Sequence, residues 1–297
     1  MRLLPLLLPL LWFGPRPTPQ PDRLLAIKVD PDVAVRIHNL VGTTRVTGWD
    51  RDSIVVVGRI PPRSGRFFGG GGGRGAKLGV EGQDPSLTGP GSDLDVRVPR
   101  GARISIKSAS ADVEVTDLGG EVETSCVTGS IRVSGAPRVA TLESIDGDIT
   151  MTGAATVIRA RTGAGAVRIT GARGDLAVTT VQGPITIDTD QLLSARVESV
   201  SGRVEIRSGV LLDGLLDVST HDADVQLFLP DPIDARFDLS TVKGAIVTGL
   251  PGHRGPAAER TARFSVGKKA GAGRGAGITI RTFSGGIQVH SSGKKRR

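Results

Sequence analysis

Residues 122–151 read VETSCVTGSIRVSGAPRVATLESIDGDITM, and this stretch decides the fold because it holds two successive copies of one unit. Gly129 and Gly147 mark the same point in the two copies, 18 residues apart, and each is followed two positions later by an isoleucine. Working outward, this anchor position recurs as Ala111, Gly129, Gly147, Gly165, Gly183, Gly202, Ala223, Gly244 and Gly285. A repeat of 18 to 21 residues predicts stacked coils, each one a unit too small to fold alone.

Within each unit, apolar and polar residues alternate on both sides of the anchor. Two positions after the anchor stands a column of β-branched residues: Val113, Ile131, Ile149, Val167, Ile185, Val204, Val225, Ile246 and Ile287. Apolar residues also predominate four positions after the anchor and five and seven before it, with mostly polar residues between. This period of two predicts two short strands per coil, each with one buried face. The coil is either a flat two-sheet roll or, with a third short segment near 135–139, triangular.

Glycines and hydroxyls also form columns. We interpret the anchor glycine as a turn residue that needs either a positive φ or close backbone approach, and a second glycine six positions on as the turn that closes the coil. Three positions before the anchor stand small polar residues, interpreted as an inward structural ladder: Ser108, Cys126, Ser144, Thr162, Thr180, Ser199, Thr220, Thr241 and Thr282. Cys126, the single cysteine, is therefore expected to be a buried small side chain rather than a reactive thiol.

The predicted fold is an all-β, single-chain β-solenoid (β-helix or β-roll) of about ten coils over residues 22–290, with 18–21 residues per coil. Residues 39–49 look like an opening copy of the repeat, with Asn39 in the ladder position and Gly42 as anchor. Two Gly-rich insertions, 61–91 and 251–277, are expected to be mobile loops, the second interrupted by a strand at 262–266. Helix signals are nearly absent.

The two ends of the chain bear on localisation. Residues 1–21 combine an apolar run too short to span a bilayer with a Pro-rich segment, which predicts a secretory signal peptide and leader. An uncleaved anchor or a misassigned start is the alternative. Residues 291–297 form a basic tail. We therefore expect an extracytoplasmic protein, located in the periplasm, the cell envelope or secreted.

The net charge of +8 is concentrated in a few segments. Residues 251–297 carry eleven Lys and Arg against Glu259 alone, and a second basic group lies in the first insertion. Such charges attract anionic lipid, polysaccharide or other polyanions, or they protect exposed sheet edges from pairing. The candidate anion-binding residues are Arg63, Arg66, Arg74, Lys77, Lys268, Lys269 and Arg274.

No catalytic or cofactor site is predicted. Gly69–Gly75 lacks the Lys-Ser/Thr of a phosphate loop, and the four His have no metal-ligand spacing. Asp146, Asp148, Asp222 and Asp224 suggest calcium, but the acids do not persist from coil to coil as they do in calcium-binding β-rolls. We expect neither an enzyme nor a cofactor or metal site.

The phrases at 143–151, 161–169, 198–206 and 281–289, together with 96–103 and 227–230, resemble a bacterial family of domains of unknown function that carries the label "putative adhesin". Its repeated S-x-x-G-D-I-x-V phrase departs here at Ala111, Ala223, Pro184 and Arg203. The resemblance covers roughly residues 30–290 and implies a β-solenoid at the cell envelope without catalytic residues.

The expected function is thus a non-enzymatic, adhesin-like surface or scaffold protein. The alternatives are a polyanion- or membrane-binding module that works through the basic insertions, and an envelope filament built by end-to-end association of coil ends. Expected partners are an envelope polymer, an anionic surface or another protein, with no specific nucleic acid.

Overall fold

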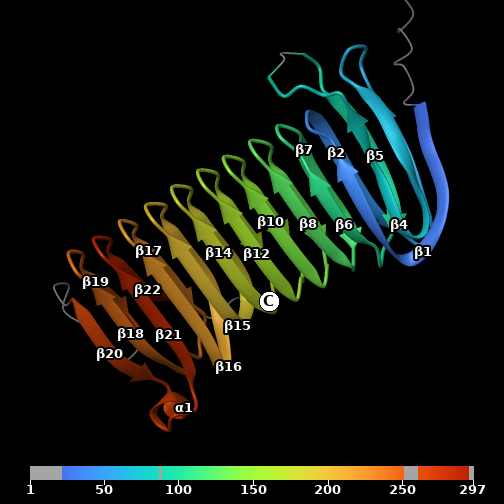
Figure 1. Cartoon of the computed structure of the whole chain (residues 1–297). Helices are drawn as coiled ribbons and strands as arrows, with labels where there is room; N and C mark the ends of the chain where they lie inside the picture. The colour runs from blue at the N-terminus through green and yellow to red at the C-terminus, as the bar shows by residue number, and fades with distance from the viewer. Residues whose placement is uncertain (1–21, 87–88, 251–259, 294–297) are drawn as a thin grey trace, which may run out of the picture.

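The computed structural model describes residues 22–86, 89–250 and 260–293, and it is an elongated all-β stack (Figure 1). Two rows of strands run along the stack, and each repeat adds one strand or half-strand to each row. The segment near 135–139 adds no third strand, since β9 ends at Gly135 and β10 begins at Val139. The flat, two-strand alternative for the coil is therefore the one the structure shows.

Row A contains the strands that precede the anchors. In spatial order they are β4 (Arg66–Glu81), the second half of β1 (Asp22–His38), β6 (Arg103–Lys107), β8 (Glu121–Cys126), β10 (Val139–Ser144), β12 (Val157–Thr162), β14 (Asp175–Thr180), the second halves of β15 (Ile185–Ser199) and β16 (Val204–Thr220), β21 (Ala276–Thr282), β18 (Ala235–Thr241) and β20 (Thr261–Val266).

Row B contains the strands that follow the anchors. In spatial order they are β3 (Ser53–Arg59), β5 (Ser92–Pro99), β2 (Gly42–Trp49), β7 (Asp112–Leu118), β9 (Ile131–Gly135), β11 (Ile149–Thr152), β13 (Val167–Thr170), the first halves of β15 and β16, β17 (Val225–Leu229), β22 (Ile287–Ser291) and β19 (Ile246–Gly249). Both rows are parallel except at β3, and at β20 in row A.

The core lies between the two rows and is continuous. All nine side chains of the β-branched column are buried in one apolar cluster, with at most 2% of each residue exposed. In the middle of the chain each strand pairs with the strand one repeat later: Ile131 lies beside Ile149, and Ile149 beside Val167. Burial of aliphatic side chains at about 25 cal/mol per Å² is the main stabilisation, and hydrogen bonds between coils satisfy the backbone.

The two glycine columns have different causes. A Cβ on Gly165 would lie 2.0 Å from the carbonyl oxygen of Gly147, and the other anchor glycines meet the preceding coil in the same way. From Gly129 to Gly285 the anchors are therefore glycine because stacked turns approach closely, not because φ is positive. Gly42, the anchor of the opening copy, has both a close approach and a φ of 117°. The second column does need a positive φ, which is 130° at Gly135, 125° at Gly153 and 78° at Gly171.

The hydroxyl column is the structural ladder that its spacing predicts. The backbone N–H of Gly147 donates to Ser144 Oγ at 2.9 Å, and Gly183 N–H donates to Thr180 Oγ1 at 3.0 Å. In other coils the hydroxyl donates instead to the anchor carbonyl, as Thr220 does to Ala223. The column thus closes each turn from inside.

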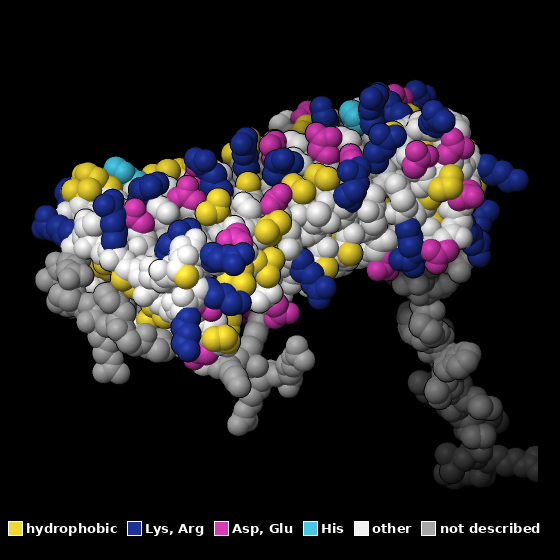
Figure 2. Space-filling view, turned by 90° about the horizontal axis from the view of Figure 1, so that it is seen from below, with side chains coloured by type: hydrophobic (Ala, Val, Ile, Leu, Met, Phe, Trp, Pro, Cys, Tyr) yellow, Lys and Arg dark blue, Asp and Glu magenta, His cyan; other side chains and the backbone are white. Residues whose placement is uncertain are grey.

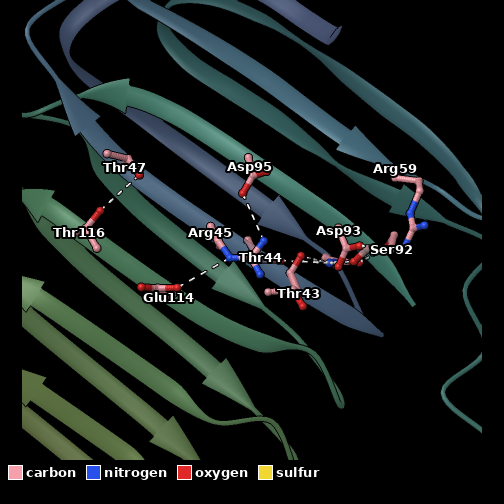
Figure 3. A network of polar contacts seen from close by, with 11 residues as sticks. Thr43, Thr44, Arg45, Thr47, Arg59, Ser92, Asp93, Asp95, Glu114 and Thr116 are labelled. Carbon is pink, nitrogen blue, oxygen red and sulfur yellow. Dashed lines mark hydrogen bonds and ion pairs between the residues drawn. The ribbon is translucent and has the colours of Figure 1, made fainter. Parts of the chain in front are cut away.

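The first end of the stack does not follow chain order. Val46 of β2 pairs with Val96 of β5 on one side and Val115 of β7 on the other, so the first coil of the sequence lies second in space. The first half of β1 turns away to pair antiparallel with β3. Half-exposed ion pairs tie these strands together, with Arg45 lying between Asp95 and Glu114 (Figure 3).

The other end shows the same exchange of order. Val225 of β17 pairs with Ile287 of β22, and Ile287 pairs with Ile246 of β19. The last strands of the sequence, β21 and β22, therefore lie between β16–β17 and β18–β19 rather than at the end of the stack. β20 adds an antiparallel strand to β18.

The loop prediction for 61–91 is wrong for residues 66–81, which form β4. The guanidinium of Arg66 and the carboxylate of Glu81, at the two ends of β4, lie 2.6 Å apart, so the strand folds back on itself. Its second half pairs with β1, and Ala76, Leu78 and Val80 are buried. Glycine does not prevent a strand where a neighbouring edge supplies hydrogen bonds, and this apolar alternation was present in the sequence.

The second insertion is only partly as predicted. The strand expected at 262–266 is present as β20, and a short helix that the sequence did not indicate, α1 (Lys268–Gly271), follows it. Residues 251–259, the leader at 1–21 and tail residues 294–297 lie outside the described residues.

Candidate functional site

The most regular exposed feature is a row of turns that joins row A to row B, here called the turn ridge. It consists of the residues two positions before each anchor and their spatial equivalents: Leu40, Ala109, Val127, Ile145, Gly163, Val181, Val200, His221, Phe283 and Val242. Backbone hydrogen bonds link each turn to the next, for example Asp146 N–H to the Val127 carbonyl and Phe283 N–H to the His221 carbonyl. The turns line one long edge of the stack (Figure 1).

The ridge carries apolar side chains in water. Val127, Ile145, Val181, Val200, Val242 and Phe283 are between 38% and 57% exposed, Ile145 the most. At one end the rings of His221 and Phe283 stack with centroids 4.9 Å apart, and the ammonium of Lys243 lies 4.8 Å from the Phe283 ring centre. Single exposed apolar residues are ordinary, whereas an aligned row of them is typical of a contact surface.

The repeat itself carries a sequence signal for the turn ridge. Five of these positions, Val127, Ile145, Val181, Val200 and Val242, are Val or Ile at one fixed slot of the repeat, which alternation alone does not explain. The slot lies on the turn, outside the period-two pattern, so strand alternation could not assign it to the core or to the surface.

The predicted anion-binding residues do not form one site. Arg63, Arg66, Arg74 and Lys77 belong to the first insertion, whereas Lys268, Lys269 and Arg274 surround α1 at the opposite end of the stack (Figure 1). Two of the first group are engaged by carboxylates, Arg66 by Glu81 and Arg74 by Asp30 at 3.9 Å. Arg63 lines a hollow of about 290 Å³ with Gln83 and Asp84.

Lys77 does belong to a cluster, here called the basic patch: Arg36, His38, Lys77 and Lys107. Arg36 lies beside Lys77 across β1 and β4, and His38 lies beside Lys107 across β1 and β6. Burial lowers the pKa of His38, and the positive charges of Lys77, Lys107 and Arg36 lower it further. Among the described residues, Arg36, Lys77 and Lys107 form no ion pair, and all three are exposed. The Lys77 ammonium lies 5.5 Å from the centre of the Phe68 ring.

Outside these two surfaces, charge is mixed. Lys and Arg side chains alternate with Asp and Glu along the face of the stack seen in Figure 2, with no extended region of one sign. A separate group of exposed leucines, Leu193, Leu212 and Leu215, lies where β15 and β16 bend between the rows.

Of the four aspartates considered for calcium, Asp148 and Asp224 bind backbone N–H groups of a neighbouring coil, and Asp222 binds a serine side chain. Asp148 accepts the N–H of Ala166 and Asp224 accepts the N–H of Gly286, both at 2.8 Å, which joins neighbouring coils. Asp222 accepts the hydroxyl of Ser284. Within residues 22–86, 89–250 and 260–293, no three His, Cys, Asp or Glu side chains are placed to share a metal ion.

Cys126 lies in the hydroxyl ladder, 4% exposed. Burial raises the pKa of its thiol to about 11, so it stays protonated and weakly nucleophilic near neutral pH. This agrees with a buried, unreactive side chain.

In the part of the chain that the structure describes, no helix is both long and apolar enough to cross a bilayer.

Comparison with known proteins places these surfaces in a family context. A family model described as Toastrack DUF4097 matches residues 63–249. A solved structure described as a "putative cell adhesion protein" from Clostridium sporogenes is 11% identical over 92% of this chain and 100% of that chain, with a TM-score of 0.23. A TM-score of this size transfers neither fold nor function. No curated protein matches the sequence.

Proposed function

We propose, from the premise that this chain belongs to the Toastrack DUF4097 family, that it is a non-enzymatic β-solenoid of about ten coils that presents an adhesin-like or scaffolding surface outside the cytoplasm. The observation that carries this proposal is the turn ridge. Its apolar side chains stand at one slot of successive repeats, and hydrogen bonds between the turns fix their spacing.

The physical argument concerns pre-organisation and repetition. Exposed aliphatic side chains are held on a rigid stack, so a partner that covers them does not have to order flexible loops. The contact at each turn contributes little binding free energy by itself. A partner that contacts several aligned turns at once is held by all of them, so the loss of one contact weakens its binding. A binding surface of this kind needs no pocket and no catalytic group.

The proposal is tested by capture from cell-envelope extract with the purified full chain. Ile145→Asp and Val181→Asp place charges on the ridge and are expected to abolish capture of envelope material. Leu212→Asp, which changes a comparably exposed leucine away from the ridge, is the matched control. Equal capture by ridge variants and wild type contradicts the proposal, as does fractionation that finds the protein only in the cytoplasm.

Binding of polyanions is a second candidate function, and the basic patch favours it. Three unpaired cationic side chains on adjacent strands attract an anionic polymer or membrane surface. Arg36→Glu with Lys77→Glu is expected to shorten retention on heparin or on vesicles containing phosphatidylserine, and raised salt should do the same. Lys268→Glu with Lys269→Glu is the control. Retention lost only in that control assigns binding to α1 instead.

A further inference from the structure

We propose that the turn ridge is the contact surface between two copies of this chain. The copies associate side by side and antiparallel, about a two-fold axis that passes between the turns of Ile145 and Gly163. This inference goes beyond the adhesin-like role and does not require it, since pairing is measured on purified protein without any other partner. Both roles use the turn ridge, so a second copy and an envelope partner compete for it.

The first argument is shape. Ile145 is the most exposed of the large apolar residues of the ridge, and the next turn presents Gly163, which has no side chain. About the proposed axis, Ile145 of each copy faces Gly163 of the other. The projecting isoleucine side chain therefore fits the space above the glycine, and the two-fold axis makes this contact twice. The same register places Val127 opposite Val181 and Ala109 opposite Val200.

The second argument is spacing. Neighbouring turns follow the strand separation of about 4.8 Å, and a partner stays in step over several turns only if its own contacts repeat at that distance. An α-helix repeats every 5.4 Å and loses register within a few turns. A second copy of this chain has the required spacing by construction.

The third argument is charge complementarity beside the ridge. A column of residues lies two positions before the ridge, near the C-terminal ends of the row A strands and on their outward face. It consists of Lys107, Ser125, Glu143, Arg161, Thr179 and Glu198. In the antiparallel register, Glu143 faces Arg161, Lys107 faces Glu198 and Ser125 faces Thr179, each pair twice. Neither Glu143 nor Arg161 forms an ion pair with another described residue of its own chain.

The charges beside the ridge also disfavour the other ways of aligning the two copies. A shift by one coil brings Glu143 opposite Glu143 in one direction and Arg161 opposite Arg161 in the other. A parallel pair in register brings Glu143 toward Asp146 and Asp148 of the second copy. On the other side of the ridge, the antiparallel register places Asp112 opposite Arg203. Like charges do not meet in the columns directly beside the ridge, and the Glu114–Glu205 approach lies one column farther out.

The contact area indicates the strength of this association. The six turns from Ala109 to Val200 give a strip about 29 Å long, so a width near 28 Å is needed for the roughly 800 Å² per partner of a stable complex. The two strand rows lie only about 10 Å apart. The interface therefore belongs to the small, reversible class, and dimerisation should depend on concentration and weaken with salt.

Sedimentation velocity over a wide concentration range tests the pairing. Wild type should shift from monomer to dimer, Arg161→Glu and Glu143→Arg should each abolish the shift, and the double variant should restore it. Arg159→Glu, on the same strand and outer face but two residues farther from the ridge, should behave as wild type. Circular dichroism melting confirms that each variant is folded.

Cross-linking tests the orientation. With Cys126→Ser, the pair Val127→Cys and Val181→Cys should form a disulfide-linked dimer on oxidation. Within one chain these positions are three coils apart, about 14 Å, which is too far for a disulfide. Val127→Cys alone should stay monomeric. A wild-type monomer at all concentrations, a double charge reversal that fails to restore the dimer, or equal cross-linking by Val127→Cys alone each overturns the proposal.

Discussion

The middle of the stack and its two ends are built from the same repeat but obey different rules. Between β6 and the first half of β16, each strand lies beside the strand one repeat away in the sequence. At the ends, β1–β2 and β21–β22 lie one coil inward from where chain order would put them. The period therefore fixes the shape of a coil, whereas which coil comes next depends on the edges left open.

Strands β21 and β22, the last in the sequence, hold the coil at the far end of the stack in place. Among the described strands, β18 pairs with β20 and β21, and β19 pairs with β22. Strands β18, β19 and β20 are therefore joined to the rest of the stack through β21 and β22, which come later in the chain. The middle has no such dependence, because each coil supports the next in order.

The largest predicted effect comes from removing β21 and β22. A chain ending at Gly275 lacks β21 and β22, and we expect residues 235–275 to become accessible to protease, because β18 and β19 lose these partner strands. The unfolding transition should broaden or move to a much lower temperature. A chain ending at Gly293 retains both strands and should melt as the full chain does. Limited proteolysis with mass spectrometry makes the comparison.

Deleting one whole repeat from the middle should cost far less. Removal of residues 145–162 joins Ser144 to Gly163 in the same register, so the chain should fold with one coil fewer and a modestly lower melting temperature. If this deletion unfolds the protein while the truncation at Gly275 is harmless, the contrast between middle and ends is wrong.

The next effect concerns close approach between coils. Gly165→Ala places a Cβ 2.0 Å from the carbonyl oxygen of Gly147, and we expect a loss of about 3 kcal/mol in the free energy of unfolding. Gly72→Ala, in the folded-back tip of β4, meets nothing within 4 Å and should change that free energy by less than about 0.5 kcal/mol. Urea denaturation measures both, and equal losses would contradict the assignment.

A smaller effect is predicted for the hydroxyl ladder. Ser144→Ala leaves the N–H of Gly147 without its acceptor inside the turn, which should lower the free energy of unfolding by about 1–2 kcal/mol. Cys126→Ser, at the same position one coil earlier, supplies a hydroxyl and should leave stability unchanged or raise it by about 0.5 kcal/mol. The two substitutions should have opposite or clearly unequal effects in the same denaturation experiment.

The last predicted effect is a dependence on pH, which appears only in alkaline solution. The pKa of Cys126 is raised from 9.0 to about 11, so the folded state holds this proton more tightly than the unfolded state. The full stabilisation is present below pH 9, and the free energy of unfolding should fall as pH rises from about 9 to about 11. Cys126→Ser removes this contribution. Denaturation at several pH values, with iodoacetamide labelling of the native protein, checks the slope and the slow thiol reaction.

The sequence contains most residues of the candidate surfaces, but it does not show which of them are exposed or which lie together. Val127, Ile145, Val181 and Val200 recur at one slot, yet only the turns show that they point to solvent. Lys77 was identified as a candidate, whereas its neighbours Arg36 and Lys107 are far away in sequence and meet it through strand pairing. The other predicted cations are divided between the two ends, because the insertions that carry them are separated by the length of the stack.

The amino-acid order alone specifies the architecture of one coil: its two strands, its buried β-branched column, its hydroxyl ladder and its glycine anchors. These follow from alternation within a repeat and from the close stacking of similar repeats. The tertiary structure alone decided the order of coils at both ends, the strand in the Gly-rich insertion and the composition of the basic patch. These depend on which edge hydrogen bonds are free for a segment to take. Any strand of the right length and pattern can satisfy such an edge, so the local sequence does not specify which one does.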